Sequence, residues 1–404
     1  TLSAMKILLE DTIPFGTDYL NSVGEIETYA WQSLVPEMLR DVDILALRST
    51  TKVTPELLTS ASKLKFVTTA TAGTNHLDKT HLDSVGIMHS SAAGCNAVAV
   101  AEYVLSVLLH AQKAQKLDLY NATVGIVGAG NVGTALSRIL MAIGVKHCLY
   151  DPPLQQALAK SGKKEHNGQS FVDLAQIAKC DVISLHVPFI KGGEYPTYQM
   201  IDEAFLEGLT SNQLLINACR GEVIDEVALL SVLRGEKPPT VVLDVFDNEP
   251  AINTALFDYV WFVTPHIAGH SVEGKVRGTQ MIYEQICDVV GKAPDKVLSD
   301  FLEKTNPIKV ALNSPEAVRL SVEDLIAVFH NVYDVAIDDE ITRNAFASGH
   351  NETPETHIAN TFSTLRKQYR VRRECSAYAL HLPKNTSKQI QDTFTKLGFH
   401  VSLV

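Results

Sequence analysis

Short runs of apolar and β-branched residues recur along the first two thirds of the chain, separated by stretches with helical spacing. Most of these runs lack alternating polar residues, which is typical of parallel strands that are covered on both faces of a sheet. Repeated alternation of such strands with helices predicts a doubly wound parallel α/β architecture. The expected strands are residues 6–10, 43–49, 65–71, 87–91, 123–128, 147–151, 181–187, 214–219, 241–246 and 260–265.

Two longer apolar segments, 96–116 and 272–290, predict helices. The pattern changes after residue 292, where we expect a helix near 321–336, a polar loop at 347–357 and a strand–helix–strand unit over 376–404. This pattern predicts a separate α+β region whose expected role is self-association.

Composition narrows the class of protein. A chain of 404 residues is too long for one small core, and its net charge of -11 argues against non-specific binding to nucleic acid or anionic membranes. The six cysteines are scattered without a CxxC pair, which is typical of reduced thiols rather than a disulfide framework or a zinc site. We see neither an apolar run of about 20 residues nor a secretion signal, so we expect a cytoplasmic protein without membrane partners.

A glycine-rich turn follows the expected strand 123–128. The segment TVGIVGAGNVG gives Gly128, Gly130 and Gly133 the spacing G-x-G-x-x-G, with Asn131 and Val132 opening a helical pattern. This context after a strand makes the motif informative, because glycine allows a tight turn, close approach of a pyrophosphate and close helix packing. The free N–H groups of the helix start would then bind phosphate.

Asp151 ends the next expected strand, close to the expected offset of about 20 residues from the glycine turn. A carboxylate there accepts hydrogen bonds from both ribose hydroxyls and repels a 2′-phosphate. Pro152 and Pro153 follow it rather than an arginine. The sequence therefore predicts NAD rather than NADP as the cofactor.

Ionisable residues follow three later strands. Arg220 follows 214–219, Asp244 and Glu249 follow the strand at 241–246, and His266 follows 260–265. The carboxyl ends of strands in open α/β sheets line the ligand crevice, so we expect these side chains to converge. A guanidinium binds a carboxylate bidentately, a histidine transfers protons near neutral pH, and a paired carboxylate orients that histidine. Beside NAD, this set suits oxidation of a 2-hydroxy acid.

The segment TPHIAGHS raises a metal alternative, because His266 and His270 are four residues apart. Zinc-binding pairs with this spacing usually lie within a helix, whereas Pro265 and Gly269 predict a turn here. No third ligand accompanies the pair at a suitable spacing. We therefore expect no metal, with His266 as the acid–base.

These motifs resemble the D-isomer-specific 2-hydroxyacid dehydrogenase family. The hallmarks GIVGAGNVG, LLINACRGEVID, VVLDVFDNEP and TPHIAG occur in order within residues 5–292. The resemblance implies two Rossmann-like lobes and a C-terminal α+β dimerisation domain. The implied parts are a flavodoxin-like substrate-binding lobe at 5–99 and 264–292, an NAD-binding Rossmann domain at 100–263, and the dimerisation domain at 293–404.

A closer likeness is to the branch of this family that oxidises a phosphorylated four-carbon 2-hydroxy acid for bacterial pyridoxal phosphate synthesis. It rests on RSTTKV (48–53), TATAGTNHLD (69–78), TPHIAGHSVEGKVRGT (264–279) and LRKQYRVRRE (365–374). It implies a homodimer and the following sites: catalytic Arg220, Glu249 and His266; substrate contacts Ser49, Thr71, His270 and Arg220; NAD contacts Gly128, Gly130, Asn131, Val132, Gly133, Asp151, Val187, Ala218, Cys219, Arg220, Asp244 and Gly269.

Two residues depart from that branch. Val187 stands where a threonine is expected, and His270 stands where a substrate-contacting tyrosine is expected. Arg48, Ser49, Lys52 and the turn at 71–75 are the nearest candidates for binding the substrate phosphate. Two alternatives stay open: a dehydrogenase for phosphoglycerate or another D-2-hydroxy acid, and a non-enzymatic NAD-sensing corepressor on the same fold.

Overall fold

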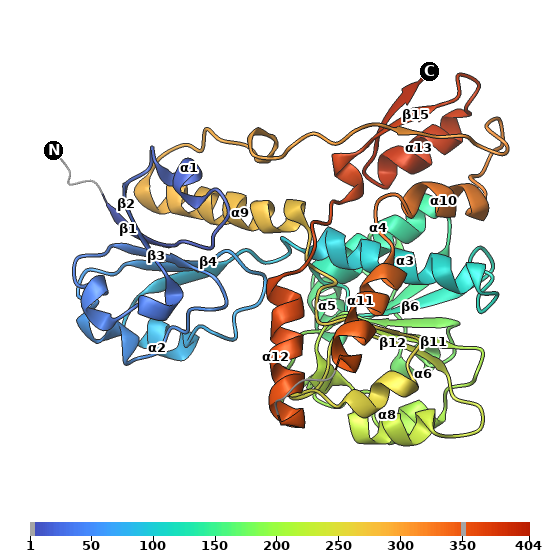
Figure 1. Ribbon diagram of the computed structural model, residues 1–404, viewed down its shortest axis with the longest axis horizontal. Helices are drawn as coiled ribbons and strands as arrows, with labels where there is room; N and C mark the ends of the chain where they lie inside the picture. Colours follow the sequence, from blue (N-terminus) through green and yellow to red (C-terminus); the bar gives the residue numbers. More distant parts are fainter. Residues whose placement is uncertain (1–4, 349–352) are drawn as a thin grey trace. The chain divides into compact units, whose positions relative to one another are not determined.

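The computed structural model describes residues 5–348 and 353–404 (Figure 1). Contacts between residues divide the chain into a first unit, Thr1–Asn96 with Ser271–Lys304, and a second unit, Ala97–His270 with Thr305–Val404. The C-terminal residues from 305 onward thus group with the second unit. The expected assignment of three parts to substrate, NAD and dimerisation stays a prediction.

The first unit contains a parallel five-stranded sheet in the order β2-β1-β3-β4-β5. This order is typical of flavodoxin-like doubly wound folds. Its strands are β1 (Lys6–Glu10), β2 (Glu25–Tyr29), β3 (Ile44–Leu47), β4 (Phe66–Thr69) and β5 (Met88–Ser91).

Both faces of the first sheet are covered. Along β1, Ile7 and Leu9 join a core with Ile282 and Tyr283 of the helix α9 (Val272–Val290), whereas Leu8 joins a core on the opposite face. Helices α1 (Gly16–Leu20) and α2 (Lys79–Ser84) complete the unit. Successive strand residues point to opposite faces, so a strand buried on both sides is apolar at most of its positions.

The second unit contains a parallel six-stranded sheet in the order β13-β12-β11-β10-β6-β7. The chain builds outward from β6 to β7, then returns to β10 on the other side of β6, so the strand order reverses between β6 and β10. Ligands bind at such a reversal in open α/β sheets. The strands are β6 (Thr123–Val127), β7 (Lys146–Tyr150), β10 (Val182–Leu185), β11 (Leu214–Asn217), β12 (Thr240–Leu243) and β13 (Phe262–Val263).

Helices cover both faces of this second sheet (Figure 1). On one face, α3 (Ala97–Lys113) and α4 (Asn131–Ile143) share a core with β6 and β11, and on the other lie α6 (Leu174–Ile177) and α8 (Glu226–Leu233). The helix α5 (Pro152–Ala159), the hairpin of β8 (Glu165–His166) and β9 (Gln169–Ser170), and α7 (Glu203–Glu207) occupy the connections. The doubly wound α/β fold that the sequence predicts is confirmed.

The C-terminal region, residues 305–404, packs onto the same unit. Its three-stranded parallel sheet has the order β14-β15-β16, formed by β14 (Ile308–Lys309), β15 (Ala379–Leu382) and β16 (His400–Leu403). Its helices are α10 (Val322–Phe329), α11 (Val335–Ala347), α12 (Pro354–Lys367) and α13 (Lys388–Lys396). Phe329, Leu380 and Phe394 join the core that also contains α3 and α4, so this region shares a core with the sheet domain.

Two expectations for the C-terminal region differ from the structure. The single helix expected at 321–336 is two helices, because α10 ends at Phe329 and the Asp334 side chain caps the start of α11. The expected loop at 347–357 is shorter, since α12 begins at Pro354; residues 349–352 of that loop lie outside the described residues.

No helix in the described ranges combines the length and apolarity needed to cross a bilayer.

Candidate functional site

The site residues expected in the second unit lie at one edge of its sheet. Because the six strands are parallel, their carboxyl ends meet at the same edge. Gly128 follows β6, Asp151 follows β7, Val187 follows β10, Ala218 and Cys219 follow β11, Asp244 follows β12, and residues 264–270 follow β13. The topology therefore brings together residues that are up to about 140 positions apart in the sequence.

Glycine is suited to the three positions of the turn after β6 for different physical reasons. Gly128 has φ +95°, and a Cβ atom there would lie 2.3 Å from the His186 carbonyl oxygen. A Cβ atom on Gly133 would lie 1.9 Å from the Gly128 carbonyl oxygen. A Cβ atom on Gly130 would meet no protein atom within 4 Å. The fold itself requires Gly128 and Gly133, whereas Gly130 keeps open a space next to the start of α4.

That space fits the diphosphate of a dinucleotide. Gly130 is the N-cap of α4, and no side chain among the described residues caps this helix start. An uncapped helix start presents free N–H groups and the positive end of the helix dipole, which favour an anion.

Replacing Gly130 with alanine is expected to weaken NAD binding at least about tenfold, because the new methyl group would occupy the space in which backbone and diphosphate approach each other. The melting temperature should change little, since the methyl group meets no protein atom within 4 Å. NADH fluorescence titration and thermal unfolding measure the two quantities. Gly192→Ala is the matched control, because its Cβ atom also meets nothing and it lies outside the site. Unchanged NADH affinity in Gly130→Ala would argue against this phosphate position.

Asp151 is held in place by backbone groups. One carboxylate oxygen accepts from Ala129 N–H at 2.9 Å and the other accepts from Leu154 N–H at 3.0 Å, where Asp151 caps α5. The carboxylate is therefore fixed beside the glycine turn. Each oxygen retains acceptor capacity, so the donor set fits the ribose hydroxyls of NAD.

His266 and Glu249 form a hydrogen-bonded pair. His266 Nδ1 lies 2.7 Å from Glu249 Oε2, and Glu249 Oε1 accepts from Phe246 N–H at 2.9 Å. Burial pushes the pKa of Glu249 upward, but the hydrogen bond from His266, the charge of His266 and the Phe246 N–H outweigh it and lower the pKa. An ionised Glu249 accepts from the Nδ1–H group of His266, which leaves Nε2 as the ring nitrogen that faces proton transfer.

Asp244 holds the backbone of the segment that carries His266. Its carboxylate accepts from Ile267 N–H at 2.8 Å, Ala268 N–H at 3.0 Å and the Thr264 hydroxyl at 2.7 Å. Asp244 is 1% exposed. The structure thus gives this residue a role in shaping the turn, which the sequence did not suggest, and its contact with NAD stays a prediction.

The loop that carries Arg220 closely approaches the backbone of the loop that carries Glu249. A Cβ atom on the following Gly221 would lie 1.8 Å from the Phe246 carbonyl carbon, so only glycine lets the two loops touch. Asn217 Nδ2 donates to the Arg220 carbonyl at 2.9 Å, and Arg220 Nη1 donates to the Cys219 carbonyl at 2.7 Å. Arg220 is half-buried and forms no ion pair within 4.0 Å to a carboxylate in the described chain. Its guanidinium keeps donors for an anionic ligand.

Glu226 supports the loop that carries Glu249. It accepts from Asp247 N–H at 2.7 Å, and burial together with neighbouring carboxylates raises the pKa of Glu226 to about 7. Between its ordinary value of 4.5 and about 7, the folded protein keeps a proton that the unfolded chain releases. This group therefore lowers the free energy of unfolding as pH rises through that window.

Replacing Glu226 with glutamine is expected to flatten the fall in unfolding free energy between pH 4.5 and 7, because the amide oxygen still accepts from Asp247 but no longer titrates. Urea unfolding at several pH values measures this slope. Glu236→Gln, at an exposed position, is the matched control. A slope that matches the parent protein would show that Glu226 is not the titrating group.

The substrate-contact candidates of the first unit also follow strand ends. Ser49 follows β3 and is exposed, and the Thr71 hydroxyl lies 2.8 Å from the Thr69 hydroxyl after β4. The loop around Ser49 is organised by Glu10, which accepts from Arg48 N–H at 2.9 Å and from the Thr51 hydroxyl at 2.7 Å. Glu10 is fully buried and was missed in the sequence, since its partners lie about 40 positions away.

The structure also defines the surroundings of Lys52 and of His270 and Val187, the two residues that depart from the expected pattern. The His270 ring packs edge-on against Tyr369 with centroids 5.7 Å apart. Val187 is half-buried and packs against the core of the second sheet, and Lys52 is exposed. The contacts described for the two histidines differ, since His266 contacts Glu249 and His270 contacts Tyr369, and their separate roles stay a prediction.

One group of potential metal ligands occurs within residues 5–348 and 353–404: His110, His330 and Asp334. The imidazole rings stack with centroids 4.7 Å apart at 24°, and His110 Nε2 lies 2.7 Å from Asp334 Oδ1. Ring lone pairs lie in the ring planes, so nearly parallel rings cannot both point at one ion at about 2.0–2.1 Å. We interpret this group as packing between α3 and the C-terminal region.

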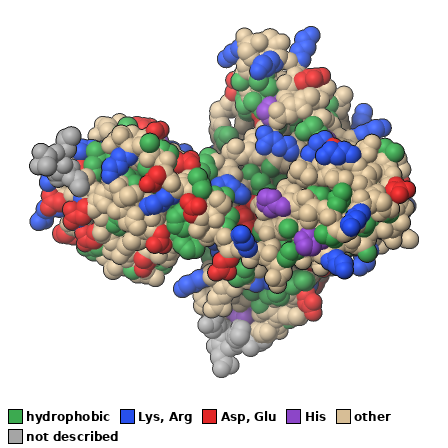
Figure 2. All heavy atoms as spheres, turned by 90° about the horizontal axis from the view of Figure 1, so that it is seen from above, with side chains coloured by type: hydrophobic (Ala, Val, Ile, Leu, Met, Phe, Trp, Pro, Cys, Tyr) green, Lys and Arg blue, Asp and Glu red, His purple; other side chains and the backbone are tan. Residues whose placement is uncertain are grey.

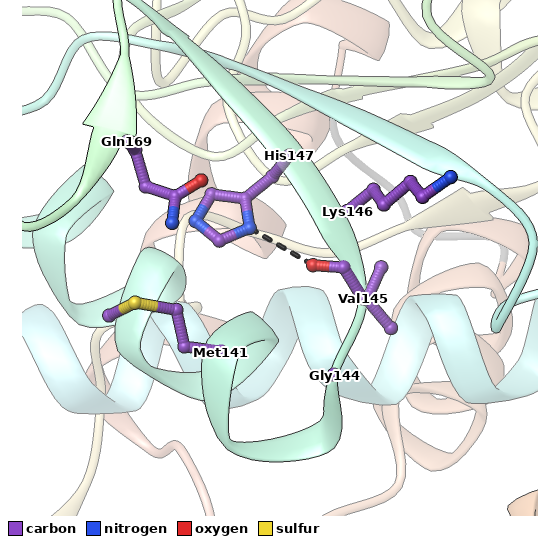
Figure 3. Close-up of a pocket in the computed structure, with 6 residues that line it drawn as sticks. All are labelled: Met141, Gly144, Val145, Lys146, His147 and Gln169. Carbon is purple, nitrogen blue, oxygen red and sulfur yellow. Dashed lines mark hydrogen bonds between the residues drawn. The ribbon is translucent and has the colours of Figure 1, made fainter.

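A shallow pocket of about 270 Å³ lies at the end of α4 that is remote from the glycine turn (Figure 3). In it, His147 Nδ1 donates to the Val145 carbonyl at 3.0 Å. The lining residues are Met141, Gly144, Val145, Lys146, His147 and Gln169. None of the expected site residues is among them, so this pocket is not part of the candidate site.

Charges on the displayed face are mixed. Figure 2 shows acidic and basic side chains scattered among hydrophobic and other atoms, without a continuous basic surface on that face. The net charge of the chain is -11. Neither observation suggests a basic surface that would bind the phosphates of a nucleic acid.

Comparison with known protein families agrees with this geometry. The NAD-binding domain of the D-isomer-specific 2-hydroxyacid dehydrogenases matches residues 98–268, and a domain of unknown function matches residues 303–398. Among solved structures, D-lactate dehydrogenase from Aquifex aeolicus, with NAD and lactic acid, has a TM-score of 0.54 at 23% identity, covering 70% of this chain and 96% of its own. NAD-dependent formate dehydrogenase from Staphylococcus aureus, with NAD, has a TM-score of 0.54 at 22% identity, covering 73% of this chain and 98% of its own. These structures share the fold.

Relatives that match almost the whole chain are more specific. Erythronate-4-phosphate dehydrogenase from Pseudoalteromonas atlantica is 44% identical over 379 residues, 93% of this chain and 95% of the relative. The enzyme of that name from Marinobacter nauticus is 43% identical over 404 residues, 99% of this chain and 100% of the relative. The chain therefore belongs to the erythronate-4-phosphate dehydrogenase family, within the NAD-dependent D-isomer-specific 2-hydroxyacid dehydrogenases.

Proposed function

We propose that this protein oxidises 4-phospho-D-erythronate to 3-hydroxy-2-oxo-4-phosphobutanoate with NAD, a step of pyridoxal 5′-phosphate synthesis. The observation that carries the proposal is the 2.7 Å pair of His266 Nδ1 and Glu249, located at the same sheet edge as Arg220 and the glycine turn. Relatives that carry the name of this activity extend over nearly the full chain, which supports the choice of substrate.

Each residue has a chemical task in this proposal. His266 Nε2 takes the proton of the C2 hydroxyl, and the ionised Glu249 stabilises the resulting imidazolium. Arg220 binds the substrate carboxylate through its planar fork of donors. NAD, when bound, accepts the C2 hydrogen as a hydride with both electrons. Ser49, Thr71 and His270 contact the substrate, and Arg48 is a candidate for its phosphate.

The NAD set of this proposal comprises Gly128, Gly130, Asn131, Val132, Gly133, Asp151, Val187, Ala218, Cys219, Arg220, Asp244 and Gly269. At position 187 the valine side chain offers no hydrogen bond, so any polar contact there must come from the backbone. We further propose that residues 5–99 and 264–292 bind substrate, that residues 100–263 bind NAD, and that residues 293–404 form a homodimer. Six free cysteines are compatible with action in the cytoplasm.

The test is reduction of NAD by the purified protein with three substrates. We expect NADH absorbance with 4-phospho-D-erythronate, in a single turnover if the cofactor stays bound, and much less with 3-phosphoglycerate or D-lactate. Preferred turnover of 3-phosphoglycerate would assign the protein to another 2-hydroxy acid. NADH binding without turnover of any of the three would support the NAD-sensing corepressor instead.

A further inference from the structure

The segment that carries His266 is held from two sides. We define the catalytic turn as residues 264–270, between β13 and α9. Asp244 receives the N–H groups of this turn: Ile267 and Ala268 donate to its carboxylate, and His266 N–H donates to its backbone carbonyl at 2.6 Å. The carbonyl groups of His266 and Ala268 accept instead from residues about 100 positions later in the chain.

Those later residues belong to the C-terminal region. Arg372 Nη1 donates to the Ala268 carbonyl at 2.8 Å, and Arg366 Nε donates to the His266 carbonyl at 3.3 Å. Tyr369 lies edge-on to His270, as described above, and Asp339 accepts from Val263 N–H at 2.7 Å just before the turn. The C-terminal region therefore contacts both the backbone and a side chain of the catalytic turn.

Arg372 has the most unusual environment of this group. It is 2% exposed, its second terminal nitrogen donates to the Ala99 carbonyl of α3 at 2.6 Å, and its guanidinium lies 3.7 Å from the centre of the Tyr333 ring. A guanidinium stays charged when it is buried, and its desolvation is costly unless its donors are hydrogen-bonded. Its rigid fork joins the catalytic turn to α3 at a fixed separation, which the single flexible ammonium of lysine cannot reproduce.

The turn needs such support because of its backbone. His266 has φ +57°, in the left-handed region that non-glycine residues rarely adopt. A conformation of this kind persists only where the surrounding contacts fix it. Asp244 fixes the N–H side, and the arginines fix the carbonyl side. If the carbonyl side were released, the imidazole would be free to move away from its alignment with Glu249.

We infer that Arg372 is a positioning residue for catalysis, through which the C-terminal region holds His266 in its productive orientation. This inference rests on the proposed function, in which His266 is the acid–base. It gives the C-terminal region a task inside each chain, separate from the proposed dimerisation.

The experiment compares Arg372→Lys with Arg319→Lys in the full-length protein. Arg319 is a matched control: it also lies in the C-terminal region, donates to two backbone carbonyls, Ile143 at 3.1 Å and Gly144 at 2.8 Å, and stacks on Tyr120 at 3.4 Å. It contacts the remote end of α4. We expect Arg372→Lys to lower kcat about 10–100-fold, as a displacement near 1 Å does, with NADH affinity within about twofold of the parent. Arg319→Lys should retain the parent kcat.

Amide hydrogen exchange provides a readout that does not depend on the substrate. Peptides that cover residues 264–270 should exchange faster in Arg372→Lys than in Arg319→Lys, while peptides from β6 and β11 stay protected in both. Arg366→Gln, at a half-buried position, should produce a smaller change of the same kind if Arg372→Lys fails to fold. Equal kcat in the two lysine variants, or unchanged exchange over 264–270, would overturn the inference. Faster exchange over 264–270 in a protein that turns over none of the substrates would reject the proposed function, and with it the catalytic role of Arg372, while the support that Arg372 gives to the turn would be confirmed.

Discussion

Replacing His266 with asparagine is expected to lower kcat for 4-phospho-D-erythronate by about 10²–10⁴-fold, the usual contribution of a general base. Asparagine tolerates the left-handed backbone of position 266, with φ +57°, so the turn should keep its path. What it lacks is a ring nitrogen that can take the hydroxyl proton. The affinity for NADH should stay within about twofold, because the imidazole acts on the substrate. Initial rates of NADH formation and fluorescence titration measure the two effects.

His400→Asn provides the control for this change, since His400 is exposed on β16. The kcat of His400→Asn should match that of the parent protein. A His266→Asn variant that keeps kcat within about threefold of the parent protein would remove His266 from the chemistry and leave the pair with Glu249 as a structural contact.

Replacing Arg220 with lysine is expected to lower kcat/KM by about 10²–10⁴-fold, because the two charge-assisted hydrogen bonds of a bidentate pair are each worth about 1.5–3 kcal/mol. Lysine keeps the positive charge but not the planar fork. The fold should survive, since the contact of Gly221 with Phe246 involves only the backbone. Steady-state rates over a range of substrate concentrations measure the effect.

Arg234→Lys is the matched control, because Arg234 stacks on Tyr259 at 5.6 Å and lies outside the site. Arg220→Lys should weaken the binding of an inhibitor that keeps the substrate phosphate but lacks its carboxylate by a much smaller factor than it lowers kcat/KM for the substrate. Equal losses for substrate and inhibitor would place the guanidinium near the phosphate instead.

Much of the fold could be predicted because strands that are buried on both faces of a sheet appear in the sequence as runs of apolar residues. Strand β3 is apolar at every position, β11 is buried throughout with Asn217 as its one polar residue, and the expected helix at 272–290 matches α9. The edge strand β2 was missed, since Glu25, Glu27 and Thr28 are exposed and its pattern EIETY has little apolar content. A strand at the edge of a sheet needs no second apolar face, so it resembles a loop.

Some residues of the candidate site could be predicted from the sequence and others could not. Arg220, Glu249 and His266 could be expected at one edge of the sheet because ionisable residues occur after apolar strands, and the topology of a parallel sheet places strand ends together. Asp244 was expected for a ligand contact, whereas its carboxylate holds the backbone of residues 267 and 268. Arg372 could not be identified at all, because its acceptors are backbone carbonyls, and these carry no signature in the side-chain sequence.

The left-handed backbone at His266 has a consequence for laboratory evolution. A non-glycine residue in this conformation costs about 1–2 kcal/mol relative to glycine, and asparagine tolerates it better than histidine does. A library screened for heat resistance alone would therefore reward glycine or asparagine at position 266. Such a screen would deliver robust proteins without activity, so selection on this scaffold has to couple survival at high temperature to turnover.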